Sequence, residues 1–286
     1  MNDTNVDEQT EGTLGANPQN RRRKGRHRRQ LQAGDLPDFL IIGTQKGGTT
    51  FLYNILRRHP HFKAAAKKEI HFFDAPRFRR GVDWYRTQFP RQQRRNGQKV
   101  ITGEASPYYL FYPHAPRRVA ETIPRVKLLA LLRNPVDRAY SDYQHTLRQE
   151  FETLGFKEAL ELEEERLRGE KEKILADESY RGINHRRYSY LARGIYVDQL
   201  KEWHRYFDRE QLLILKSEDF FARPWETMVS VLEFLDLPER DFELEGKRNE
   251  GGYSEPMAAD TRQWLRDYYE PHNKRLYEYL GRDFGW

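Results

Sequence analysis

The strongest constraint on the fold is an apolar segment that runs directly into a glycine-rich turn. The segment Phe39-Leu40-Ile41-Ile42 is short and continuous, and it is followed by Gly43-Thr44-Gln45-Lys46-Gly47-Gly48-Thr49-Thr50. Residues 49–58 then place apolar side chains at the spacing of one helix face. A short apolar run is typical of a strand that is buried on both faces of a parallel sheet. The pattern therefore predicts a strand, a tight turn and a helix in direct succession.

The rest of the chain continues this alternation of short apolar strands and amphipathic helices. We expect strands at residues 100–103, 126–132 and 211–215, and helices near residues 114–122, 136–150, 156–175, 188–207, 225–236 and 258–280. Such alternation predicts an α/β, P-loop-like fold of three layers, with a central parallel sheet flanked by helices. Ligands of these sheets bind at the carboxyl ends of the strands. The candidate site therefore lies in the turns that follow Ile42, Thr102, Leu132 and Leu215.

The positive charge of the chain is concentrated near its beginning. The formal net charge is +6 over 286 residues, and seven cations stand within the nine residues from Arg21 to Arg29. Subtracting those seven charges from +6 leaves the other 277 residues at −1. Residues 1–34 also hold almost no side chain that could be buried. We therefore predict a disordered basic tail at 1–34 and one folded domain at 35–286.

Two absences in the sequence exclude whole classes of protein. The chain has no cysteine, which excludes disulfide frameworks, thiolate zinc sites and cysteine nucleophiles. No apolar run approaches the roughly 18–20 residues that span a bilayer, and the acidic beginning of the chain lacks the apolar core of a secretory signal. We therefore expect a soluble, cytoplasmic protein that does not contact a membrane.

The glycine-rich turn has the composition of a phosphate cradle. Backbone N–H groups of such a turn and of the following helix N-terminus point at a bound anion, and the helix dipole adds to the attraction. Gly47 and Gly48 allow close approach, Lys46 adds a cation, and Thr49 and Thr50 add hydroxyl donors. The turn nearly matches the nucleotide-kinase pattern G-x-x-x-x-G-K-[ST], but Thr49 stands where that pattern has its lysine.

A second anion site is predicted after the segment 126–132. Arg133 emerges at the carboxyl end of this predicted strand, Pro135 fits the first turn of the next helix, and Ser141 lies two turns further along. An arginine grips a phosphate with two parallel hydrogen bonds, and a serine hydroxyl completes the contact. An enzyme that binds only ATP has no use for this second site.

A candidate acid–base group lies between the first two predicted strands. Glu69 and His71 differ by two positions, so in an extended segment both side chains face the same way. A carboxylate beside an imidazole, flanked by Lys68, could deprotonate a hydroxyl or amine acceptor. From the residues alone, a surface Lys–Glu pair and a packed histidine explain the segment equally well.

The two anion motifs together resemble those of sulfotransferases that use 3′-phosphoadenosine 5′-phosphosulfate (PAPS). The run G-T-Q-K-G-G-T-T-F-L, which begins at Gly43, looks like the family's 5′-phosphosulfate loop, and the run from Arg133 to Ser141 is similar to its 3′-phosphate motif R-[ND]-P-x-x-R-x-x-S. The resemblance implies that Lys46 neutralises the departing bridging oxygen and that Arg133 and Ser141 hold the 3′-phosphate. It further implies cofactor contacts by Gly47, Gly48, Thr49 and Thr50, and, through a looser match to a loop that closes over the cofactor, by Lys247, Gly251, Gly252 and Tyr253.

Residues 67–74 resemble the run K-E-x-H-F-F-D of the heparan-sulfate-type branch, the Golgi O- and N-sulfotransferases. This resemblance implies Glu69 as the base, Lys68 near the transferring sulfuryl group, and His71 and Asp74 at the acceptor. Sulfotransferases of phenols and steroids use a histidine base, so His71 is the alternative base.

A further run, Gly103 to Tyr109, corresponds to the branch's E-K-[ST]-P-x-Y-F run. Glu104 matches and is implied on the acceptor side, whereas Ala105 replaces the lysine of the relatives and weakens the expectation of a heparan-like substrate. The resemblance covers about residues 37–286. Because the disulfide and membrane anchor of Golgi relatives are missing, it implies a soluble bacterial member.

The expected reaction is transfer of a sulfuryl group from PAPS to a hydroxyl or amine, with no metal. Both a small molecule and a glycan are candidate acceptors, and the oligomeric state stays open. Two alternatives are a P-loop kinase that uses ATP and a nucleic-acid-binding protein that acts through the basic tail. The kinase would need a lysine at position 49, where Thr49 stands. Nucleic-acid binding would leave the two anion loops without a role, so we do not expect a nucleic-acid partner.

Overall fold

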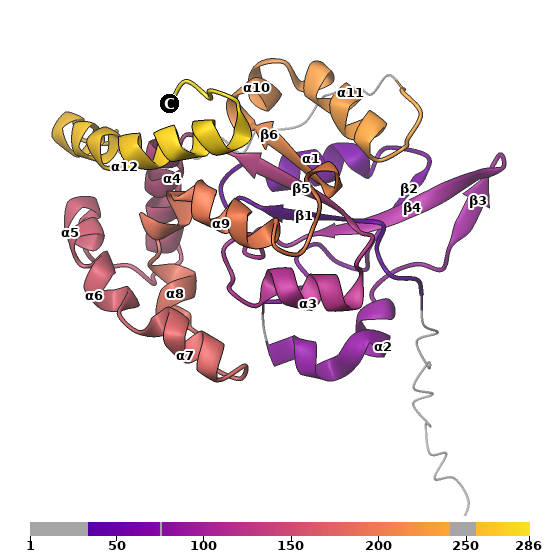
Figure 1. Cartoon of the computed structure of the whole chain (residues 1–286), viewed down its shortest axis with the longest axis horizontal. Helices are drawn as coiled ribbons and strands as arrows, with labels where there is room; N and C mark the ends of the chain where they lie inside the picture. Colours follow the sequence, from indigo (N-terminus) through magenta and orange to yellow (C-terminus); the bar gives the residue numbers. More distant parts are fainter. Residues whose placement is uncertain (1–33, 75, 241–255) are drawn as a thin grey trace, which may run out of the picture. The chain divides into compact units, whose positions relative to one another are not determined.

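The computed structural model describes residues 34–74, 76–240 and 256–286. Within them, a six-stranded sheet has the order β2-β4-β1-β5-β6, and β3 pairs with β4 (Figure 1). Every strand pairing is parallel except that of β3 with β4. The strands are β1 (Phe39–Gly43), β2 (Phe62–Ala64), β3 (Gln93–Arg95), β4 (Gln98–Ala105), β5 (Lys127–Leu132) and β6 (Leu212–Lys216).

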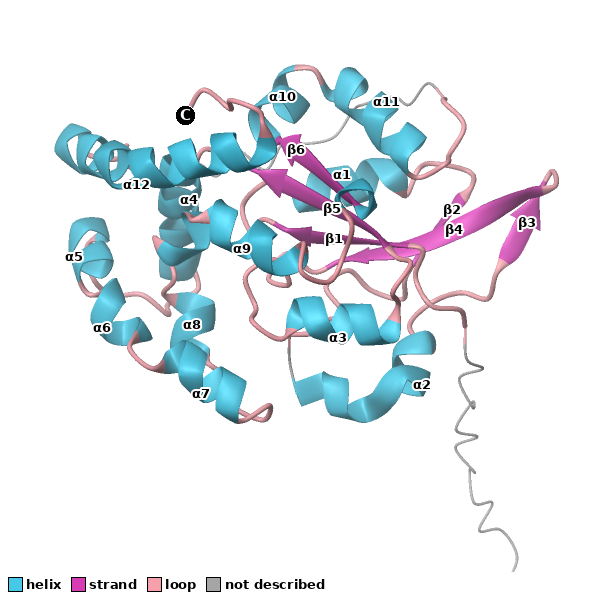
Figure 2. Cartoon of the chain, viewed as in Figure 1, coloured by secondary structure: helices cyan, strands magenta, loops and turns pink. Residues whose placement is uncertain are grey.

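Helices follow most of the strands and cover the sheet (Figure 2). Short 3-10 turns, η1 to η3, lie at Pro76–Arg80, Ala192–Gly194 and Arg209–Gln211. The α-helices in the described residues are α1 (Thr49–Leu56), α2 (Gly81–Arg86), α3 (Ala115–Thr122), α4 (Pro135–Arg148), α5 (Phe156–Glu161), α6 (Glu163–Leu167), α7 (Glu170–Ala176), α8 (Ile183–Arg187), α9 (Tyr196–Trp203), α10 (Ser217–Ala222), α11 (Pro224–Phe234) and α12 (Ala259–Leu280).

The central strands are buried on both faces, because alternate side chains enter two different apolar cores. In β1, Leu40 and Ile42 pack into a core that includes residues of α3 and α9. Phe39 and Ile41 of the same strand pack into a second core, which includes residues of α1, α10 and α11. This two-sided burial explains why the strand reads as a continuous apolar run. It also confirms the predicted α/β arrangement of a parallel sheet between helices.

The register of the sheet brings three strand ends together. Ile41 of β1 pairs with Ala105 of β4 on one side and with Leu129 of β5 on the other. Because these strands are parallel, the turns that follow Gly43, Ala105 and Leu132 lie at the same edge of the sheet. The predicted site segments meet at this edge.

Two predicted helices are shorter in the structure than the sequence pattern indicates. The expected helix at 156–175 is divided into α5, α6 and α7, and Gly169, with φ of 73°, begins α7 in a left-handed conformation. The expected helix at 188–207 is reduced to η2 and α9. Its first part is not helical because the backbone N–H groups of Leu191 and Ala192 donate to the buried carboxylate of Glu163 rather than to helical carbonyls.

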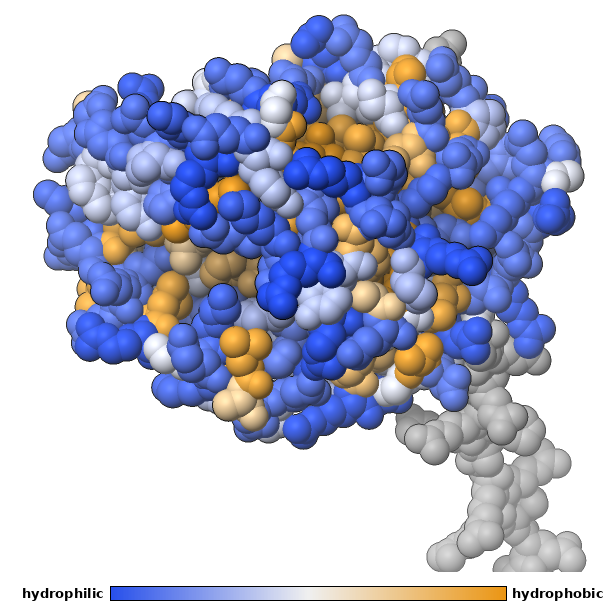
Figure 3. Space-filling model, viewed as in Figure 1, coloured by the Kyte–Doolittle hydropathy of each residue, from blue (hydrophilic) through white to orange (hydrophobic). Residues whose placement is uncertain are grey.

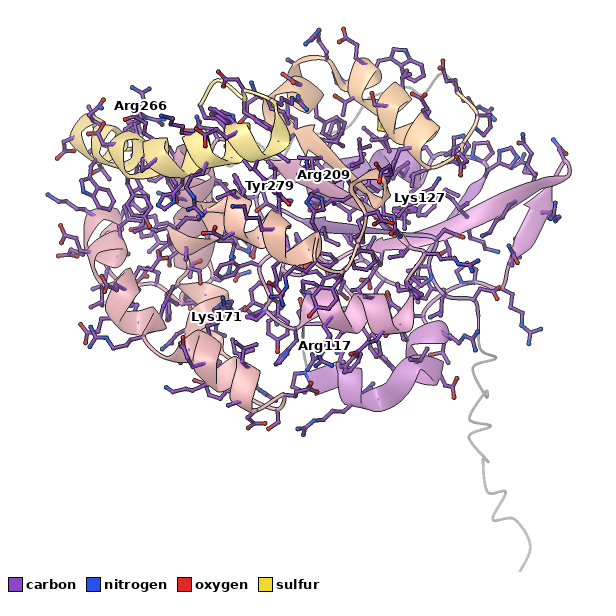
Figure 4. The ribbon with its side chains drawn as sticks, in the orientation of Figure 1. Arg117, Lys127, Lys171, Arg209, Arg266 and Tyr279 are labelled. Carbon is purple, nitrogen blue, oxygen red and sulfur yellow. The ribbon has the colours of Figure 1, made fainter. Side chains whose placement is uncertain are left out.

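The C-terminal helix α12 packs against α4 and α9. Near its end, Tyr279 lies beside Arg209 (Figure 4), whose guanidinium carbon is 4.8 Å from the ring centroid. The face of the molecule seen in Figure 3 is largely hydrophilic, with apolar residues in separate small groups. Among the described helices, none combines the length and the apolar character needed to cross a membrane. The predicted boundary between residues 34 and 35 stays a prediction, because residues 1–33 lie outside the described part of the chain.

Candidate active site

The glycine-rich turn after β1 is held tightly against the neighbouring strand β5. The N–H of Thr44 donates to the carbonyl of Leu131 at 2.9 Å, and the N–H of Gly47 donates to the carbonyl of Thr44 at 3.0 Å. A Cβ atom at Gly47 would lie 2.5 Å from the Leu131 carbonyl oxygen. Gly48 precedes α1 with φ of 96°, a conformation that favours glycine. Both glycines are therefore required by the backbone of the turn.

Lys46 lies in this turn as a partly buried cation with no ion-pair partner among the described residues. Its own backbone has φ of 69°. Burial lowers the pKa of its ammonium, Asp142 opposes this effect, and the nearby Arg148 and Arg133 add to it. Partial loss of solvation without a paired anion is unfavourable for an ammonium, so this position favours binding of an anionic ligand.

Arg133 and Ser141 enter the site from the end of β5 and from α4. Arg133 directly follows the strand, and its Nη1 donates to the carbonyl of Lys46 at 3.1 Å. The Tyr196 hydroxyl donates to the carbonyl of Arg133 at 2.7 Å. The Asn134 side chain caps α4 by accepting from the N–H of Val136 at 3.0 Å. These bonds fix the arginine beside the glycine-rich turn.

Glu69, His71 and Asp74 form a connected acid–base cluster. His71 Nε2 lies 3.4 Å from Glu69 Oε2, and His71 Nδ1 lies 2.7 Å from Asp74 Oδ2. Glu69 and His71 have φ of 60° and 54°, so the expectation of an extended segment is wrong, although the two side chains do lie together. The contacts arise because the segment forms a left-handed turn rather than a strand.

The cluster has a defined charge state at neutral pH. The hydrogen bond from His71, with support from Lys68, lowers the pKa of Glu69 to about 2 against the opposing effect of burial. Burial alone would lower the pKa of His71, but its hydrogen bonds to Asp74 and Glu69 raise it to about 9. Arg186 Nη2, 3.3 Å from His71 Nε2, is a cation that opposes this rise. Glu69 is therefore an anion and His71 a cation.

Most of the predicted site residues line one large cleft. Its volume is about 2180 Å³, more than twice the roughly 300–1,000 Å³ of a typical small-ligand pocket. Nine Lys and Arg residues and five Asp and Glu residues line it, so its lining is strongly cationic. The predicted residues among its lining are Lys46, Gly48, Thr49, Thr50, Glu69, His71, Asp74, Arg133 and Ser141.

Four groups of predicted site residues either do not line the cleft or lie outside the described residues. Glu104 is fully buried and does not line the cleft, which corrects its predicted contact with an acceptor. Gly47 lies against β5, and the Lys68 ammonium bonds Glu69 rather than lining the cleft. The predicted cofactor loop lies outside the described residues, with Lys247, Gly251, Gly252 and Tyr253.

The structure adds cleft residues on α4 that the motifs did not identify. Asp142, His145 and Arg148 line the cleft together with Ser141. Their spacing of one, four and seven residues after Ser141 is that of a single helix face, a signal the sequence contains. Asp142 also pairs with the buried Arg193 at 3.1 Å.

The cleft thus combines a glycine turn with a partly buried lysine, an arginine and a serine at the end of β5 and on α4, and an ionised carboxylate. A family model described as "Sulfotransferase domain" matches residues 36–248. The chain belongs to the sulfotransferase family. The family assignment makes this protein a transferase, as the sequence indicated.

Relatives and a solved structure agree with this assignment. The sulfotransferase is 28% identical to the membrane-associated sulfotransferase kil1 of Dictyostelium discoideum, covering 88% of this chain and 66% of that protein. It is 32% identical to heparan sulfate glucosamine 3-O-sulfotransferase 3B1 of Mus musculus, covering 88% of this chain and 65% of the relative. The chain thus spans about two thirds of the length of these relatives.

The fold agrees with that of a sulfotransferase crystal structure from Alicyclobacillus acidocaldarius. The two chains are 32% identical with a TM-score of 0.70, covering 87% of this chain and 98% of the other. The predicted P-loop-like fold of the sulfotransferase is confirmed by this likeness. No group of three or more metal-ligating side chains occurs among the residues described for the sulfotransferase.

Proposed function

We propose that this enzyme transfers the sulfuryl group of PAPS to an acceptor hydroxyl or amine. The observation that carries the proposal is the partly buried Lys46 ammonium in its glycine turn, joined to the Arg133 site through the hydrogen bond at the Lys46 carbonyl. A ligand with a 5′-phosphosulfate and a separate 3′-phosphate matches these two cationic sites. Thr49 and Thr50, at the N-terminus of α1, add donors to the first of them.

In the proposed reaction, the acceptor oxygen or nitrogen attacks sulfur in line. The bond from sulfur to the bridging oxygen breaks, and the negative charge passes to the 5′-phosphate. Lys46 stabilises this developing charge, because a fixed cation in a water-poor site acts most strongly where charge accumulates. The acceptor proton passes to Glu69.

The charge state of the cluster supports Glu69 rather than His71 as the base. A base must be unprotonated, and the pKa values of about 2 for Glu69 and about 9 for His71 leave only the carboxylate in that form near neutral pH. A carboxylate with such a low pKa is a weak base. Its proton transfer therefore comes late, after bonding to sulfur has made the acceptor proton acidic.

The dimensions and charge of the cleft support an anionic glycan as the acceptor. The volume of about 2180 Å³ exceeds what one nucleotide-sized ligand requires. Arg181, Arg186 and Arg187 line the side of the cleft that also contains His71 and Asp74. Two of the relatives' names specify heparan sulfate glucosamine as the group that is sulfated.

Thermal stabilisation by nucleotides tests the donor. We expect 3′-phosphoadenosine 5′-phosphate, at about 100 times its Kd, to raise Tm by roughly 5–10 °C. The same concentrations of 5′-AMP or of ATP with magnesium should raise Tm less, because neither ligand carries a 3′-phosphate. Arg133→Ala should remove the preference for the 3′-phosphate.

A matched arginine serves as the control for this experiment. Arg205 is largely exposed, pairs with Glu202 and lies outside the cleft, so Arg205→Ala should respond to the nucleotides as the wild type does. A larger shift with ATP than with the 3′-phosphorylated nucleotide would contradict the proposal and favour a kinase.

A further inference from the structure

The turn that carries Glu69 and His71 is held through four consecutive backbone amides. The N–H of Glu69 donates to the carbonyl of Ala105 at 3.1 Å. The next three N–H groups donate to side chains: Ile70 to Glu104 Oε2 at 3.2 Å, His71 to Ser106 Oγ at 3.2 Å, and Phe72 to Tyr109 Oη at 2.9 Å. All four acceptors belong to residues 104–109, at the end of β4. The backbone N–H groups of the turn are therefore held by residues outside the turn.

The hydroxyls of Ser106 and Tyr109 have only one way to orient their protons. Each accepts from a backbone N–H of the turn, so each must donate its own proton elsewhere. Both donate to Glu104: Ser106 Oγ lies 2.7 Å from Oε2, and Tyr109 Oη lies 3.0 Å from Oε1. Tyr85 Oη also donates to Oε1, at 2.6 Å. Together with the N–H of Ile70, Glu104 accepts four hydrogen bonds.

Within this network Glu104 acts only as a hydrogen-bond acceptor. A carboxylate offers about four lone-pair sites, and donors occupy all of them. Burial raises the pKa of Glu104, and these hydrogen bonds oppose that rise. The side chain is fully buried and lies outside the cleft, so it cannot contact the substrate that receives the sulfuryl group or the nucleotide that supplies it. A buried carboxylate is costly unless its hydrogen bonds are complete. The same atoms that satisfy it are those that hold the turn.

We infer that Glu104 is the positioning residue for the catalytic turn, acting on Ile70 directly and on His71 and Phe72 through Ser106 and Tyr109. Left-handed backbone at non-glycine residues is strained and persists only where the surroundings enforce it. Glu69 and His71 are both in this conformation, and the network supplies the bonds that enforce it. The inference rests on the proposed role of Glu69 and His71 at the acceptor.

Two buried tyrosines provide a matched pair of variants. Tyr109 and Tyr85 are both fully buried and both donate to Glu104 Oε1. Only Tyr109 also accepts from the turn, whereas the Tyr85 hydroxyl bonds Glu104 alone among the described residues. Tyr109→Phe therefore removes the link between carboxylate and turn, and Tyr85→Phe removes a comparable hydrogen bond without that link.

The experiment compares kcat, nucleotide affinity and the His71 titration in these variants. For Tyr109→Phe we expect kcat to fall by roughly 10- to 100-fold, since small misplacements of catalytic groups have effects of this size. Affinity for 3′-phosphoadenosine 5′-phosphate should stay within about 2-fold of wild type, because the turn does not hold the nucleotide. By NMR, the pKa of His71 should fall from about 9 toward its ordinary value as its carboxylate partners move away.

For Tyr85→Phe we expect a similar loss of Tm, with kcat within about 2-fold of wild type and an unchanged His71 titration. Equal effects of the two variants on kcat and on the His71 pKa would overturn the inference. Glu104→Gln places an NH2 group where two donors need an acceptor. If this variant folds, we expect its kcat to fall further than that of Tyr109→Phe. The His71 titration needs no PAPS, so it tests the positioning role even if the nucleotide experiment excludes PAPS as the donor.

Discussion

At the scale of single residues, backbone strain coincides with the proposed chemistry. Lys46, Glu69 and His71 have φ between 54° and 69°, and they make up half of the non-glycine residues with positive φ in the described ranges. Such conformations cost about 1–3 kcal/mol each. The remaining three, Asn96, Glu150 and Asp236, lie outside the cleft. The strain is thus retained where it directs a cation, a carboxylate and an imidazole into one site.

Replacing Glu69 with glutamine tests the base. We expect Glu69→Gln to lower kcat by roughly 10²- to 10⁴-fold, the usual contribution of general base catalysis, with unchanged affinity for 3′-phosphoadenosine 5′-phosphate. Glu202→Gln is a suitable control, because Glu202 also pairs with a cation but lies outside the cleft. Wild-type kcat in Glu69→Gln would exclude Glu69 and return the role to His71.

The raised pKa of His71 predicts how stability depends on pH. The folded-state value of about 9 exceeds the ordinary value of 6.5, so the stabilisation is complete below pH 6.5 and is lost as pH rises toward 9. We therefore expect the difference in free energy of unfolding between wild type and His71→Gln to shrink from pH 6 to pH 9.5. Glu69, with a pKa of about 2, stays ionised throughout this range.

Urea unfolding at several pH values measures this difference. His272→Gln is the control, since His272 lies outside the cleft, and partial burial lowers its pKa rather than raising it. A difference that grows with pH would contradict the assigned charge state of the Glu69–His71–Asp74 cluster.

At the scale of elements, helix α4 connects the two anion sites. Its Asp142 pairs with Arg138 and with Arg193, each at 3.1 Å, and all three side chains are almost completely buried. Arg193 also donates to Gln45 of the glycine-rich turn at 2.5 Å. The second anion site, with Ser141 on the same helix, is thereby tied to the first by a chain of buried polar contacts.

Removing the charge of Asp142 should destabilise the fold. Asp142→Asn leaves two buried guanidinium groups with a neutral partner, and breaking a buried pair costs about 3–5 kcal/mol. Denaturant unfolding measures the change. Asp198→Asn is the matched control, because Asp198 pairs with Arg275 at the surface, where such pairs contribute about 0–1 kcal/mol. Equal losses of unfolding free energy in the two variants would show that the buried cluster contributes no more to stability than a surface pair.

At the scale of the whole molecule, two separate concentrations of positive charge have different expected roles. One is the arginine-rich segment between Arg21 and Arg29, and the other is the lining of the cleft. The cleft cations come from η1, α4 and α8 and from the turns between elements. The cleft lining belongs to the described residues, whereas the arginine-rich segment lies outside them. We expect nucleotide binding to depend on the cleft cations and not on that segment.

Deleting residues 1–33 tests this separation. We expect the shortened chain to bind 3′-phosphoadenosine 5′-phosphate within about 2-fold of the full chain, at low and at high salt. Isothermal titration calorimetry measures the affinity, and a nonspecific DNA duplex serves as the comparison ligand. Loss of nucleotide binding on deletion, or strong salt-dependent DNA binding that disappears with it, would favour the basic-tail alternative.

The sequence predicted the parts of this protein that local patterns encode. The strand–turn–helix around Lys46, the strand ending at Leu132 and the helix with Pro135 in its first turn follow from residue spacing within about ten positions. The breaks in the expected helix at 156–175 and the buried position of Glu104 did not follow. They depend on partners far along the chain, such as the Leu191 and Ala192 amides at Glu163.

The sequence by itself thus determined the fold class, the two anion motifs and the family resemblance, because each is written in a contiguous run of residues. The tertiary structure decided which of those residues share a cleft and that Glu104 is buried beneath the site. It also decided that Glu69 is an anion and His71 a cation. The physical reason is the sheet order: β4 and β5 flank β1, so the three loops meet at one edge. Burial and hydrogen bonding there set the charges that no linear pattern encodes.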